Sequence, residues 1–192
     1  MPLTAHYYAA PRLSRVPIRR YNGQINDGGW TYNWNLARME IDSSYKGVVV
    51  SDYIESVPQE MFSSTPPSAQ VAYAHALAWC RRNYRLIVAN SYGFMNAMSA
   101  AENTSECRFF VDPETGAVDA SSPYPTRFIG KFNGVPATLG SVFTKIHEFR
   151  FLSGVVAAHH LLESGSVNHR VGFIAAFPSS AECVRGVNAF TI

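Results

Sequence analysis

The longest amphipathic pattern of the chain lies near its C-terminal end. Residues at three- and four-residue steps there are Val142, Ile146, Phe149, Ser153, Val156 and His160. At 100° per residue these positions form one narrow stripe of a helix. We therefore predict a long helix over about residues 141–164, capped by Ser141 and stopped by Gly165, with this stripe buried.

A second helical pattern occupies about residues 66–82. Thr65 or Ser68 can cap this helix, and prolines are well tolerated in a first helical turn. Ala72, Ala76 and Trp79 fall on one stripe, beside a second stripe that begins with Val71. The β-branched stretch RLIVANSY that follows predicts a buried strand.

Shorter patterns predict strands elsewhere. In ARMEIDSSYKGVVVSDYI (residues 37–54), Met39 and Ile41 alternate with Glu40 and Asp42, which indicates one or two strands. Alternate residues of a strand share a face, so Glu40 and Asp42 would lie together as a paired-acid site or a solvated surface. The segments CRFFVD, RFIGKFNG and HRVGFIAAFP predict three further strands. SSAECVRGVNAF predicts a short closing helix with a partial capping box.

The order of these elements favours an α+β fold over a regular doubly wound sheet. We expect a mixed or mostly antiparallel sheet, with one long helix (about 141–164) and a second helix (about 66–82) packed on it. Residues 1–35 contain three prolines and two turn signals, and they form an irregular basic N-terminal arm or a hairpin. Residues 36–192 form a single α+β domain.

The balance of residue types indicates a surface that faces other protein. Charged residues make up 16% of the chain, against roughly 25% in soluble chains. Aromatic residues reach 13%, and only three of the 16 basic residues are lysines. Low charge with many aromatic residues and arginines is typical of interface cores, and arginine tolerates burial better than lysine. We predict a homo-oligomer or a larger assembly.

This composition favours a self-assembling structural protein, in its most concrete form a virion component such as a capsid, tail or connector protein. Its partners would be copies of itself and other virion proteins, and its location the virion or the host cytoplasm. The N-terminus lacks the apolar core of a signal peptide, and no run of 18 apolar residues occurs. No cofactor or metal motif is present, which favours a non-enzymatic role.

Four arginines lie close together in the N-terminal arm: Arg12, Arg15, Arg19 and Arg20. With nearby tyrosines they could bind phosphates and stack on bases. They could also pair with acidic residues of a neighbouring subunit. The net charge of only +2 favours this interface role and leaves nucleic acid as the weaker alternative.

The alternative function is a small α+β enzyme, a transferase or hydrolase that uses a histidine and a cysteine. Its candidate catalytic residues are His147, Glu148, His160 and Cys107. His160 would serve as a general base and Cys107 as a nucleophile. The competing interpretation makes His160 a core imidazole and leaves the cysteines as reduced thiols. The zinc motif H-E-x-x-H fails because residue 151 is Phe, so we predict no metal.

Overall fold

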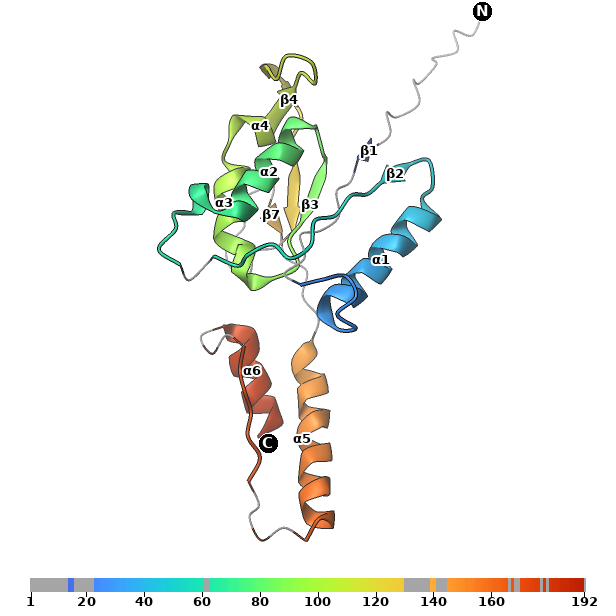
Figure 1. Cartoon of the computed structure of the whole chain (residues 1–192), viewed down its shortest axis with the longest axis vertical. Coiled ribbons are helices and arrows are strands. Elements are labelled where there is room, and N and C mark those ends of the chain that lie inside the picture. Colours follow the sequence, from blue (N-terminus) through green and yellow to red (C-terminus); the bar gives the residue numbers. More distant parts are fainter. Residues whose placement is uncertain are drawn as a thin grey trace, which may run out of the picture. The chain divides into compact units, whose positions relative to one another are not determined.

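The computed structural model describes residues 14–15, 23–60, 63–129, 139–140, 145–165, 167, 170–176, 178 and 180–191. The chain has an α+β fold (Figure 1) and divides into two compact units, residues 1–142 and 143–192. The division near residue 35 stays a prediction, because most of residues 1–35 lie outside the described part of the chain. Arg12, Arg19 and Arg20 lie outside the described residues, and Arg15 is described only through the backbone of a short strand.

The first unit contains helices and three small sheets. Its helices are α1 (Trp30–Ser44), α2 (Val71–Arg81), α3 (Met95–Glu102) and α4 (Ser105–Arg108), with short 3-10 turns at Pro67–Ala69 and Tyr92–Phe94. Its strands are β1 (Ser14–Arg15), β2 (Val49–Val50), β3 (Leu86–Val88), β4 (Phe109–Val111), β5 (Val118–Pro123), β6 (Arg127–Ile129) and β7 (Leu139–Gly140). The second unit contains α5 (Ile146–Glu163) and α6 (Ala181–Phe190).

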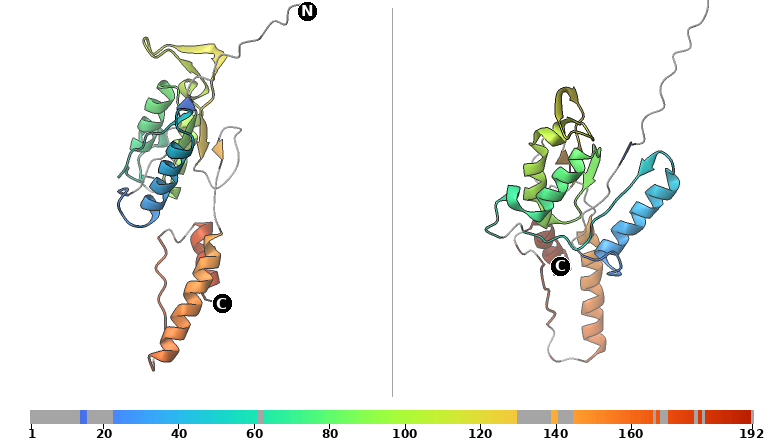
Figure 2. Two further views of the ribbon diagram at one scale, coloured as in Figure 1. Left: turned by 90° about the vertical axis from the view of Figure 1, so that its right-hand side faces the viewer. Right: turned by 45° about the horizontal axis from the view of Figure 1, so that its top comes forward.

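Parallel and antiparallel strand pairs occur in separate sheets. Strands β3, β6 and β7 form a parallel sheet in which Ile87 is in register with Phe128, and Phe128 with Leu139. Strands β1 and β2 are also parallel, while β4 and β5 are antiparallel. Helices α2 and α3 pack on each other, and they lie to one side of the β3–β6–β7 sheet in the left view of Figure 2.

The core of the first unit lies between these helices and the sheet. Its largest fully buried side chains include Tyr84, Phe94, Phe128, Ile87 and Met98. Helix α2 contributes the predicted stripe of Ala72, Ala76 and Trp79, while Val71 is exposed. The small alanine side chains let α2 and α3 approach each other closely. The aromatic side chains fill the space between the helices and the sheet.

A free backbone N–H group at the N-terminus of α2 is bonded by a residue other than the caps predicted from the sequence. The Glu60 carboxylate accepts a hydrogen bond of 2.7 Å from the backbone N–H of Val71. The predicted caps, Thr65 and Ser68, make no side-chain capping bond, and Gln70 occupies the cap position. A distant carboxylate can replace a local cap because it meets both the unpaired N–H groups and the positive end of the helix.

A disulfide bond joins α2 to α4. The Cα atoms of Cys80 and Cys107 are 4.9 Å apart, and both residues are buried in the core. The expectation of reduced thiols is therefore wrong for this pair, and the sulfur of Cys107 is not available as a nucleophile. Cys183, in the second unit, is a free and buried thiol.

The segment 37–54 was expected to form strands, but its first half belongs to α1. The alternation of Met39, Glu40, Ile41 and Asp42 is too short to distinguish a strand from a helix. Helix α1 runs to Ser44, and only Val49–Val50 form a strand. On a helix Glu40 and Asp42 point in different directions, so the expected paired-acid face does not form.

Helix α5 confirms the predicted long helix in its described part, but not the predicted burial. It spans Ile146–Glu163, and Gly165 follows with a φ of 63°, the left-handed conformation that commonly ends helices. Ser141 lies outside the described residues. Phe149 and Val156 of the predicted buried stripe are each 68% exposed, and His160 is also exposed. Helix α2 packs in the first unit and α5 in the second.

The segment HRVGFIAAFP was expected to be a strand. Its described residues, 170–176, form no strand. Phe173 instead packs edge-to-face on Phe190 of α6, with ring centroids 5.3 Å apart. The aromatic residue therefore anchors the segment to a helix rather than to a sheet.

Reduction of the Cys80–Cys107 disulfide should destabilise the first unit. The bond joins residues 27 positions apart, and a closed loop of that size corresponds to roughly 3–4 kcal/mol of unfolding free energy. Urea unfolding followed by circular dichroism, with and without dithiothreitol, should show a lower midpoint in the reduced sample. The double variant C80S/C107S is the control, because dithiothreitol should not change its midpoint. An unchanged wild-type midpoint with two additional titratable thiols would contradict the prediction.

Candidate functional site

The two helices of the second unit are held together by one ion pair and by close backbone contact. Arg150 Nη2 of α5 lies 2.5 Å from Glu182 Oε1 of α6. The Arg150 guanidinium also lies 5.5 Å from the centre of the Phe173 ring. This arginine therefore neutralises a partly buried carboxylate and covers an aromatic face with one side chain.

Gly154 sets the distance between α5 and α6. A Cβ atom at this position would lie 2.3 Å from the carbonyl oxygen of Phe190, so no larger residue fits without movement of the backbone. The N-terminus of α6 begins with Ser180, whose hydroxyl accepts a hydrogen bond of 3.1 Å from Cys183 N. These contacts fix which face of α5 is turned towards α6.

The opposite face of α5 carries a regular row of exposed side chains. Its members follow a 4-3-4-3-4 spacing, and we call them the α5 seam: Lys145, which immediately precedes the helix, and Phe149, Leu152, Val156, His159 and Glu163. On a helix this spacing keeps all six residues within about 40° of one line. The three apolar members are 57–68% exposed. By contrast, Arg150, Gly154 and Leu161 lie on the face towards α6 and are half-buried.

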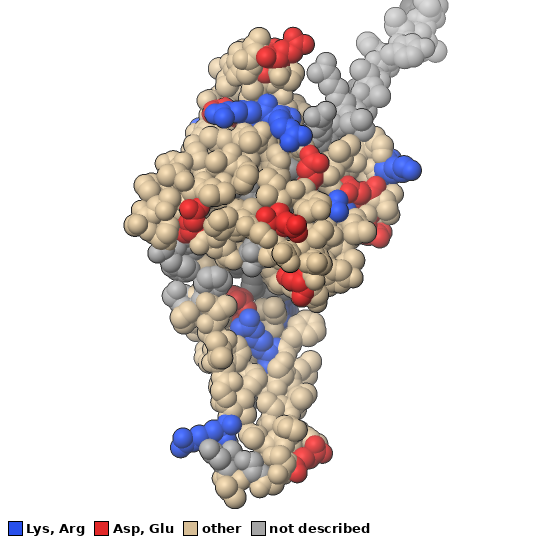
Figure 3. Space-filling model, viewed as in Figure 1, with Lys and Arg blue, Asp and Glu red and all other residues tan. Residues whose placement is uncertain are grey.

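Charge is confined to the two ends of the seam. Lys145 Nζ lies 3.4 Å from Glu148 Oε1 at the start of α5, and His159 Nδ1 lies 3.4 Å from Glu163 Oε2 at its end. His159 thus lies beside Glu163 at the end of the seam. Figure 3 shows that most of the visible surface of this unit carries neither basic nor acidic side chains. An apolar row of this kind is typical of a surface that contacts another protein.

His147 and Glu148 line one shallow groove of the second unit. The groove has a volume of about 410 Å³, and Phe151, Leu152 and Ala189 complete its lining. His160 is 13 residues further along the helix, roughly 20 Å away at 1.5 Å per residue. The structure therefore brings together two of the four candidate catalytic residues, and Cys107 belongs to the other unit, bonded to Cys80.

Two further observations concern the residues that the structure describes. They contain no group of three or more His, Cys, Asp or Glu side chains that could hold a metal ion. Within the same residues, no helix combines the length and the apolar character needed to cross a bilayer.

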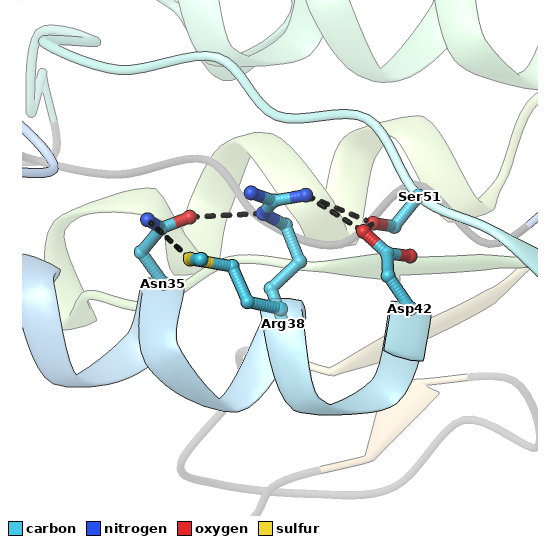
Figure 4. Close-up of polar contacts among 5 residues, drawn as sticks. Asn35, Arg38, Asp42 and Ser51 are labelled. Atoms are coloured by element: carbon cyan, nitrogen blue, oxygen red, sulfur yellow. Dashed lines mark hydrogen bonds and ion pairs between the residues drawn. The ribbon is translucent and has the colours of Figure 1, made fainter. Parts of the chain in front are cut away.

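A polar cluster in the first unit connects α1 to the chain after β2 (Figure 4). Arg38 Nη1 lies 2.8 Å from Asp42 Oδ2, and the Ser51 hydroxyl donates a hydrogen bond of 2.5 Å to the same oxygen. Arg38 Nε also donates to Asn35 Oδ1 at 2.9 Å. These bonds tie α1 to Ser51, whereas the other carboxylate oxygen of Asp42, Oδ1, is buried without a hydrogen-bond partner among the described residues.

A second polar group lies at the carboxyl end of β3. Trp30 Nε1 donates a hydrogen bond of 2.7 Å to the carbonyl oxygen of Asn90, two residues beyond the strand. Ser91 Oγ donates to Gln59 Oε1 at 2.7 Å. In open α/β sheets, ligands bind outside the carboxyl ends of parallel strands. Trp30 is half-exposed there, and its ring packs edge-to-face with the ring of Trp34, with centroids 5.9 Å apart.

Asp27 organises the loop that carries Trp30. Its carboxylate accepts hydrogen bonds from the backbone N–H groups of Gly29, Thr31 and Tyr32 at 2.8, 3.0 and 2.9 Å. These bonds, led by the one from Tyr32, lower the pKa of Asp27. The sequence indicated only a turn at Asp27-Gly28-Gly29, whereas the side chain also caps α1.

Comparison with known proteins adds no relative from which a role could be transferred. No model of a known protein family matches the chain, and no curated protein matches it.

Removal of the Asp27 carboxylate should loosen the start of α1. We expect Asp27→Ala to lower the melting temperature by a few degrees at pH 7, because three backbone N–H groups lose their acceptor. Folding lowers the pKa of this group below its usual 3.8. The wild-type advantage is therefore complete above the usual pKa and is lost as pH falls through the lowered one.

Thermal unfolding followed by circular dichroism between pH 2.5 and pH 7 measures this difference. Asp27→Asn is the control, since its side-chain oxygen still accepts hydrogen bonds but does not titrate. An alanine variant as stable as the wild type at pH 7 would show that the contacts contribute nothing.

Proposed function

We propose that this protein is a self-assembling structural protein whose copies associate through the α5 seam. The single observation that carries the proposal is the exposure of Phe149, Leu152 and Val156 on the face of α5 opposite α6. Burial of a large apolar side chain contributes about 1.5–3 kcal/mol. Because each copy supplies three such side chains, association through this row has a substantial driving force to set against the entropy of association.

The low charge of the chain supports the same proposal. Only 16% of the residues are charged, so little electrostatic repulsion opposes contact between the apolar rows of two copies. The composition suits a virion component, and it suits any other assembly whose subunits bury much of their surface. Copies of the chain are therefore the proposed partner, with a capsid, tail or connector protein as the concrete form. In such an assembly Arg12, Arg15, Arg19 and Arg20 would pair with acidic residues of a neighbouring subunit.

A charge in the middle of the seam should prevent association. We expect sedimentation velocity of the wild type at 1–100 μM to show a concentration-dependent oligomer, and Val156→Glu to weaken it by at least about tenfold, because a carboxylate would have to be desolvated in the contact. Ala158→Glu is the matched control, since it adds the same charge to an exposed position about 160° round the helix from Val156. A wild type that sediments as a 21.2 kDa monomer at every concentration would refute the proposal.

A second candidate function, ligand binding at the carboxyl end of β3, is favoured by the position of Trp30. Its indole N–H is held by the Asn90 carbonyl oxygen, while the ring remains half-exposed beside Ser91 and Gln59. A fixed aromatic face with neighbouring polar groups suits a polar molecule that contains a ring. This role is compatible with self-assembly, because it uses a different unit of the chain.

Ligand binding at Trp30 should be visible in thermal stability and in fluorescence. We expect at least one member of a panel of monosaccharides and aromatic heterocycles to raise the melting temperature and to change tryptophan emission. Trp30→Phe should remove the emission change and reduce the thermal shift. A panel without effect on the wild type would exclude these two ligand classes.

A further inference from the structure

The α5 seam has a direction as well as an apolar centre. It begins with a cation, Lys145, continues through Phe149, Leu152 and Val156, and ends with an anion, Glu163. The two ends of the row therefore carry opposite charges. Such a row is complementary to a reversed copy of itself, which is the condition for a two-fold symmetric contact.

We infer that two copies of this chain pair their α5 seams in antiparallel orientation, about a two-fold axis that lies on the seam side of the helix, level with residue 154. This inference rests on the proposed self-assembly and specifies its geometry. The axis follows from the spacing, because Lys145 and Glu163 are equally far from residue 154. Lys145 then lies opposite the partner's Glu163, and by symmetry the same ion pair forms a second time.

The apolar positions fit the same register. An axis at residue 154 places Leu152 opposite the partner's Val156, and Phe149 opposite the partner's His159. The 4-3-4-3-4 spacing is the heptad pattern with which two helices pack knobs into holes over several turns. Aliphatic side chains meet at the centre, and an aromatic ring meets an imidazole ring on each side.

The parallel alternative is disfavoured by charge. In a parallel pair at the same register, Lys145 would face the partner's Lys145, and Glu163 would face the partner's Glu163. Like charges placed opposite each other across an interface oppose binding. The helix dipoles also favour the antiparallel arrangement, because each positive end lies beside a negative end. Charge therefore selects the orientation, while the apolar centre supplies most of the affinity.

Charge reversal at the ends of the seam tests the orientation in the full-length chain. In the antiparallel pair, Lys145→Glu or Glu163→Lys alone replaces two attractive contacts by two repulsive ones. Each single variant should weaken the dimer by roughly three- to thirtyfold in low salt. The double variant K145E/E163K restores opposite charges and should recover most of the wild-type dissociation constant. The differences should shrink in 1 M NaCl, where charges are screened.

The outcomes separate this inference from the proposed function. A wild type that stays monomeric refutes both. A wild type that associates and loses association with Val156→Glu, but is unaffected by either single charge reversal, refutes the antiparallel register alone. In a parallel pair these reversals would exchange one like-charge contact for another, so no change would be seen.

Cross-linking gives an independent measurement of the same register. Under mild oxidation, a mixture of Leu152→Cys chains and Val156→Cys chains should form a mixed disulfide dimer. Homodisulfides that dominate in either separate sample would indicate a parallel pair and would overturn the inference. The wild-type chain is the control, since its free thiol at Cys183 is buried.

Discussion

The organisation of the second unit depends on one constraint: α5 carries apolar residues around most of its circumference, and within its unit it packs on α6 along one face. Gly154 lets α6 approach one face so closely that the backbone at Phe190 fills the space of a side chain. The ion pair between Arg150 and Glu182 then fixes the rotation of α5 about its axis. The opposite face cannot turn inward, so its apolar residues remain exposed. A helix that is apolar on both sides usually has partners on both sides.

The first unit has a buried core of its own, although α1 also exposes apolar side chains such as Leu36 and Met39. Its core encloses Tyr84, Phe94 and Phe128 between α2, α3 and the β3–β6–β7 sheet. The disulfide between Cys80 and Cys107 adds a covalent link between α2 and α4 within this core. The carboxylates of Asp27 and Glu60 accept hydrogen bonds from backbone N–H groups at the starts of α1 and α2. This unit therefore has an interior of its own, and its functional candidates are surface groups such as Trp30.

The sequence predicted elements best where one period extended over several turns. Helices α2 and α5 follow from such patterns. The strands β3, β4 and β6 lie within the short β-branched or aromatic segments that predicted strands. Helix α1 did not, because four alternating residues fit both periods and its cap, Asp27, lies three residues before the helix. The disulfide could not be predicted from two cysteines 27 residues apart, since their approach depends on how α2 and α4 pack. The predicted burial of His160 was wrong, because periodicity locates a stripe on a helix but does not show which stripe packs against another element.

The exposure of the α5 seam also explains how a few charges could select the orientation of a contact. If an apolar row is buried within its own chain, the charges at its ends play no part in choosing a binding partner. When the row is exposed, the apolar residues would bind any similar surface in either direction, and only the residues at the ends distinguish the directions. Lys145 and Glu163 hold those end positions on α5. A chain with only 16% charged residues can therefore still specify one contact geometry, because the positions of its charges matter more than their number.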